Sequence, residues 1–216
     1  MSRRWLVGVA LLVAAQGAHA QDPLAIPGVD AGTIAQLRQI VAATAERGLP
    51  VDPIVGEARF AALRRVAAPT LIDAAKRVAE RLEIARTALK PEPTPADIAA
   101  GAEALKYGVP PDALTAIRAA RGGRPVAVPL GVLTQLVASH VPVKRASAIV
   151  LDLIRRGADA TQLADLGNAV NTDIARGRRP EESLDWQLQS LNALLAPPGG
   201  AVGDVPSAAS GRPKKP

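Results

Sequence analysis

A short motif recurs along this chain of 216 residues and constrains its fold more than any other feature. In the motif, glycine is followed by an apolar residue and then by proline or aspartate. Glycine adopts the left-handed conformation that ends many helices, and the next apolar residue packs back on the last turn. Proline or an acidic cap then starts another helix. The motif occurs at Gly48 and Gly108, and looser versions begin at Gly28, Val66, His140 and Gly157. It predicts helices joined by short connections, which pack as antiparallel hairpins.

The segments between these joints have helical periodicity. Apolar residues recur at spacings of three and four, whereas alternating strand patterns are scarce. Asp30 and Thr94 are expected N-caps, and Asp97 stands at the third position after Thr94. Residues 52–65 are apolar on two sides, which predicts a helix packed between neighbours. We therefore expect an all-α fold. Two architectures remain open: an α-solenoid-like array of short antiparallel hairpins, or an irregular helical bundle.

The segment KPEPTPAD at residues 90–97 is the best candidate for a boundary. Prolines at 91, 93 and 95 favour extended backbone and end the helix before them. We expect an N-terminal helical part at 21–89, a proline-rich joint at 90–94 and a C-terminal helical part at 95–195. Residues 196–216 are rich in proline, glycine, alanine and serine, which predicts a disordered tail.

Residues 1–20 have the pattern of a secretory signal peptide. Arg3 and Arg4 precede an apolar run, and Ala18-His19-Ala20 forms a small-residue cleavage site. The apolar run is shorter than the roughly 20 residues that a spanning helix needs. We expect cleavage after Ala20, no transmembrane span in the mature chain, and a bacterial protein that is periplasmic or secreted.

Composition argues against several function classes. The chain has no cysteine, which excludes disulfides and thiol catalysis. After cleavage the only histidine is His140, which occupies the glycine position of a joint, so we interpret it as a helix-ending residue. Few aromatic residues remain for stacking nucleic-acid bases, and the +6 formal charge includes Arg3 and Arg4 of the leader. No nucleotide-binding or nucleophile motif occurs, so we expect no cofactor, metal site or catalytic residue, and no nucleic-acid partner.

Trp186, Arg178 and Arg179 are the candidate binding residues. Trp186 lies on the polar side of the expected helix at 180–195, about 200° round from Leu184. An exposed tryptophan is a typical contact residue, although a neighbouring helix or the tail is an alternative cover. Arginines gather at 64–65, 155–156 and 176–179. We interpret these clusters as cations at helix C-termini, and a shared anion-binding edge is the alternative.

These features favour a non-catalytic module of the bacterial envelope that binds a protein or peptide. One alternative is a carrier of small apolar ligands in a cavity between helices. A metal- or carboxylate-dependent hydrolase using aspartate or glutamate is the other.

Overall fold

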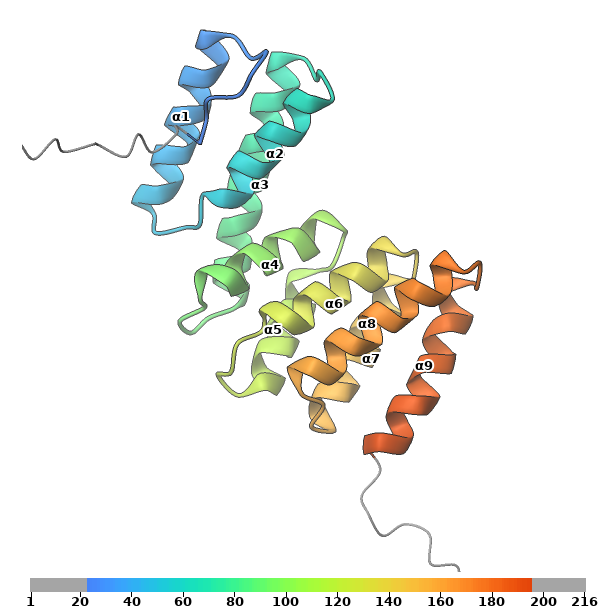
Figure 1. Cartoon of the computed structure of the whole chain (residues 1–216). Helices are drawn as coiled ribbons and strands as arrows, with labels where there is room; N and C mark the ends of the chain where they lie inside the picture. The colour runs from blue at the N-terminus through green and yellow to red at the C-terminus, as the bar shows by residue number, and fades with distance from the viewer. Residues whose placement is uncertain (1–22, 196–216) are drawn as a thin grey trace, which may run out of the picture.

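The computed structural model describes residues 23–195, which form nine α-helices and no strand (Figure 1). The all-α prediction is therefore confirmed for this part of the chain. The predicted signal peptide and tail lie outside the described residues. The helices are α1 (Ala31–Glu46), α2 (Asp52–Leu63), α3 (Ala68–Ala88), α4 (Pro95–Lys106), α5 (Pro111–Arg121), α6 (Ala127–Ala138), α7 (Val143–Arg155), α8 (Ala160–Ala175) and α9 (Pro180–Leu195).

Helices contact one another in an alternating order. Each of α1, α3 and α5 contacts the next odd-numbered helix, ending at α7, while α4 contacts α6 and α6 contacts α8. Figure 1 shows α1–α3 at one end of the molecule and α9 at the other. One cluster of buried apolar side chains runs from Leu24 to Leu191. The core is thus continuous across the predicted boundary at 90–94, where α3 packs on α4.

The predicted helix-ending joints form by a common hydrogen-bond pattern. A residue with positive φ follows the helix, and the next amide donates to a carbonyl five residues earlier, as in a Schellman motif. Leu49 donates to Thr44 at 3.2 Å, and Val141 donates to Leu136 at 3.0 Å. The left-handed residues at these joints are Gly48, Arg65, Gly108, His140, Gly157 and Gly177.

One joint differs from its predicted register. We expected the joint after α2 to begin at Val66, but the left-handed residue is Arg65, with φ of 54°. Val66 takes the second, apolar position of the motif, and its amide donates to the Ala61 carbonyl at 3.1 Å. Counted from the left-handed residue, Pro69 stands two residues later in this joint than Pro50, Pro110 and Pro142 do in theirs.

The packing of α2 also differs from expectation. Ile54, Ala58 and Ala61 are buried, but Phe60 is 54% exposed and Leu63 is 83% exposed. The prediction that both apolar sides of this helix pack between neighbours is therefore wrong. One side contacts α3, and the other faces solvent among the described residues.

A buried carboxylate links the starts of two helices. Thr94 and Asp97 form the expected capping box of α4, and the Asp30 cap of α1 is likewise confirmed. Asp97 is only 1% exposed, and its Oδ1 accepts hydrogen bonds from the amides of Val126 at 2.7 Å and Ala127 at 2.8 Å. These amides open α6, so one side chain caps α4 and α6 together.

Replacing Asp97 by alanine should destabilise the protein by about 3 kcal/mol, because three backbone donors lose their acceptor, two of them at the start of α6. Asp159→Ala is the matched control: Asp159 is exposed and caps only α8, so its loss should cost about 1 kcal/mol. Urea unfolding followed by circular dichroism measures both. Equal losses for the two variants would contradict the linking role of Asp97.

A second pair of variants tests how closely α3 and α4 pack. A Cβ on Gly101 would lie 3.0 Å from the Ala85 Cβ and 3.2 Å from Leu114 Cδ2. Gly101→Ala should therefore destabilise the protein by about 1 kcal/mol, because overpacking outweighs the gain in helix propensity. A Cβ on Gly131 meets nothing within 4 Å, so Gly131→Ala should stabilise by roughly 0.5–1 kcal/mol. Urea unfolding followed by circular dichroism measures whether each variant lowers or raises the free energy of unfolding as expected.

Candidate binding surfaces

An open hollow of about 600 Å³ lies between α1 and α3. Its floor is apolar and includes Ile40 of α1 and Ile84 of α3. A second hollow of about 440 Å³ lies between α3 and α5, and it shares Glu83 and Ile84 with the first. The two hollows adjoin at these shared residues and together form one candidate surface. We name it the α1–α3–α5 groove; its lining is Ile40, Ala43, Arg47, Lys76, Ala79, Glu80, Glu83, Ile84, Thr87, Ala88, Pro111 and Thr115.

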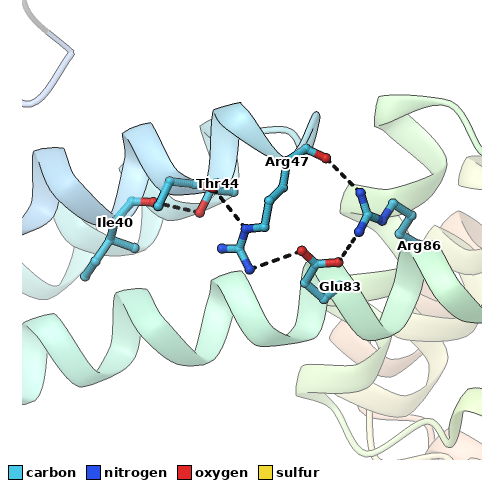
Figure 2. Close-up of polar contacts among 6 residues, drawn as sticks. Ile40, Thr44, Arg47, Glu83 and Arg86 are labelled. Carbon is cyan, nitrogen blue, oxygen red and sulfur yellow. Dashed lines mark hydrogen bonds and ion pairs between the residues drawn. The ribbon is translucent and has the colours of Figure 1, made fainter.

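A cluster of three charged residues, Arg47, Glu83 and Arg86, joins the end of α1 to α3 (Figure 2). Glu83 accepts from Arg47 Nη1 at 3.1 Å through one carboxylate oxygen and from Arg86 Nη2 at 2.5 Å through the other. Arg86 Nη1 also donates to the Arg47 carbonyl at 2.7 Å, at the C-terminus of α1. Two cations share one carboxylate, so the cluster has a net positive charge and guanidinium N–H groups left for a further acceptor.

Sequence reasoning missed the groove because its residues fall outside the buried stripe of α3. Ile84 is 44% exposed and lies beside that stripe, whose members Leu82 and Ala85 are fully buried. An isoleucine outside the apolar face of an amphipathic helix was the available signal.

The predicted contact residues Trp186 and Arg178 lie together at the other end of the molecule. Trp186 is 55% exposed among the described residues, and the Arg178 guanidinium carbon is 5.3 Å from its ring centroid. Arg178 occupies the second position of its joint, where the other joints place an apolar residue. Arg179 instead forms an ion pair with Glu182 on the first turn of α9.

The contact between α8 and α9 positions this tryptophan. Asp173 Oδ2 accepts from Gln187 Nε2 at 2.8 Å and from Ser183 Oγ at 3.4 Å. The hydrogen bond from Gln187 is the largest cause that lowers the pKa of the Asp173 carboxyl, and Arg178 adds a favourable charge. Asp173 therefore holds the first turns of α9 against the end of α8, beside Trp186.

His140 lies at the end of α6 in the left-handed conformation, with φ of 68°, as its place in the joint predicted. Neighbouring Ser139 donates to Asn171 Oδ1 at 2.8 Å and so does not face the imidazole as a nucleophile would. The arginine clusters also lie where expected: Arg64, Arg156 and Arg176 are the C-cap residues of α2, α7 and α8.

Residues 23–195 contain no group of three or more acidic or histidine side chains that suits a metal ion. None of their helices combines the length and apolar character that crossing a membrane requires. No protein-family model, curated protein or solved structure matches the chain.

The contact between Arg178 and Trp186 should affect how ions quench the tryptophan fluorescence. In the chain that begins at Gln21, Trp186 is the only tryptophan. Iodide should quench its fluorescence more strongly than caesium, because the adjacent guanidinium attracts anions. Arg178→Ala should remove this difference, while Arg155→Ala, at the end of α7, should leave it unchanged. Equal quenching by the two ions in the wild-type chain would contradict the contact.

Proposed function

We propose that this protein is an exported, non-catalytic module that binds a segment of a partner polypeptide in the α1–α3–α5 groove. The observation that carries the proposal is that two adjoining hollows, which share Glu83 and Ile84, span three helices that are not consecutive in the chain. Such an elongated apolar surface suits an extended or helical peptide. The hollows open to solvent, which favours a polypeptide over a small apolar molecule that needs enclosure.

The architecture that we propose is an α-solenoid of antiparallel helical hairpins, with parts at 21–89 and 95–195 joined by residues 90–94. The ordered contacts among α1, α3, α5 and α7, and among α4, α6 and α8, support it. In such arrays each unit contacts only its neighbours, which leaves a long surface for binding.

The charges around the groove define the ligand further. Arg47 and Arg86 share Glu83, and Lys76 and Glu80 line the same hollow with opposite charges. We therefore expect a ligand whose apolar side chains cover Ile40 and Ile84 and whose carboxylate meets the Arg47–Arg86 cluster. The exposed Trp186, Arg178 and Arg179 are a second candidate contact for a larger protein partner.

A peptide library displayed on phage and selected on the immobilised chain from Gln21 tests this function. Selected peptides should combine apolar residues with an acidic residue, and Ile84→Glu should weaken their binding at least tenfold, because a charge replaces buried apolar contact. Val128→Glu is the matched control, since Val128 is similarly exposed on α6 and lies outside the groove lining. Failure to select any peptide, or equal binding by both variants, would argue against the groove.

Export is tested separately from binding. When the full chain is expressed in a bacterium, mass spectrometry of the periplasmic fraction should detect a mature protein that begins at Gln21, because the leader has a basic start, an apolar run and an Ala-x-Ala site. Replacing Ala20 by a bulky residue should leave the precursor uncut. An intact N-terminus at Met1 in the soluble cytoplasmic fraction would contradict export.

A further inference from the structure

The C-terminal end of α2 exposes large apolar side chains. Leu63 is 83% exposed, and Phe60 lies one turn before it. Beside them is an open hollow of about 330 Å³, lined by Ala25, Ile26, Pro27, Arg59, Ala62 and Leu63. The turns that follow Pro23 cover part of this helix, since Leu24 and Ile26 are buried, but Phe60 and Leu63 remain uncovered.

Three arginines, Arg59, Arg64 and Arg65, lie within four residues of Leu63 in the chain. The Arg64 guanidinium carbon lies 5.5 Å from the Phe60 ring centroid, and Arg59 donates to the Pro23 carbonyl at 2.9 Å. We name Arg59, Phe60, Leu63, Arg64 and Arg65 the α2 tip.

No acidic residue lies near the tip in sequence. None occurs between Glu57 and Asp73, and Glu57 is paired with Lys106 of α4. Asp73 lines a different hollow together with Lys76 and residues of α1. The tip is therefore apolar and positively charged at once, and its arginines have no ion-pair partner among the described residues.

The backbone at Arg65 is a second, independent observation. Arg65 adopts the left-handed conformation that Gly48, Gly108, Gly157 and Gly177 adopt at the corresponding joints. A side chain with a Cβ is strained there, and arginine is not among the residues that tolerate the conformation well. The Arg65 side chain makes no hydrogen bond or ion pair with the described residues, so its contribution to the fold does not account for it. Such strain points to a role for the side chain in contact with something outside the chain.

We propose that the α2 tip docks this protein on an anionic lipid surface. Leu63 and Phe60 project from the helix end and would enter the boundary between headgroups and acyl chains, while the three arginines meet lipid phosphates. An anionic lipid surface fits the α2 tip better than an acidic peptide does. Leu63, the most exposed side chain of the tip, projects outward, and a lipid interface needs no matching cleft. The tip shares no residue with the α1–α3–α5 groove, so lipid docking is a function beyond peptide binding.

Co-sedimentation of the chain from Gln21 with vesicles tests the proposal. The protein should bind vesicles that mix phosphatidylglycerol with phosphatidylcholine, should not bind pure phosphatidylcholine, and should bind less as salt rises. Leu63→Asp should abolish binding. The basic residues after 196 are common to every variant, so the differences between variants measure the tip.

Arg65→Gly is the decisive variant, because it removes a charge and relieves the backbone strain together. It should weaken vesicle binding about fivefold while raising the melting temperature. Arg155→Ala removes an exposed arginine at the end of α7, and Tyr107→Ala removes an exposed aromatic residue after α4; both should bind as the wild type does. The proposal is overturned if anionic vesicles bind no protein, if Arg65→Gly binds like wild type, or if Arg155→Ala loses as much. Binding of an acidic peptide to the tip without vesicle binding would also overturn it.

Discussion

The Asp97 carboxylate is the constraint on which the middle of the chain depends. It is buried and has no cationic partner within residues 23–195; backbone amides from the starts of two helices satisfy it instead. Because α4 packs on both α3 and α6, this side chain sets how the first three helices continue into the later ones. Gly101 then lets α4 approach α3 to the limit of contact. The buried charge of Asp97 and the absence of a side chain at Gly101 together determine how α4 packs on α3 and α6.

Helices α1, α3, α5 and α7 contact one another in series, as do α4, α6 and α8, and this arrangement explains where the candidate surfaces occur. The α1–α3–α5 groove forms between odd-numbered helices because each joint returns the chain to the opposite side before the next odd helix begins. The α2 tip and the Trp186 contact lie near the two ends of the chain of contacts, where one neighbour is missing. Exposed apolar residues at such ends lack the helix that covers apolar residues in the interior of the described part of the chain.

Local signals in the sequence predicted the local structure well. The Asp30 and Thr94 caps, the left-handed His140 and the helix periodicity follow from hydrogen bonds and side-chain positions within a few residues. What the sequence did not show was which apolar faces find a partner. Two apolar sides on α2 predicted two neighbours, yet Leu63 is 83% exposed among the described residues, because burial depends on helices distant in sequence. The second role of Asp97 was hidden for the same reason: its partner Val126 is 29 residues away.

The joints also determine how the chain acquires its structure. Each is closed by a hydrogen bond from the residue after the left-handed position to a carbonyl five residues earlier, so every turn is complete once its own helix has formed. A chain whose contacts are mostly this local has low contact order and folds in about microseconds to milliseconds. The bonds from Val126 and Ala127 to Asp97 close a much longer loop, and forming that loop costs more chain entropy. We therefore expect α6 to dock on α4 only after the separate helices have formed.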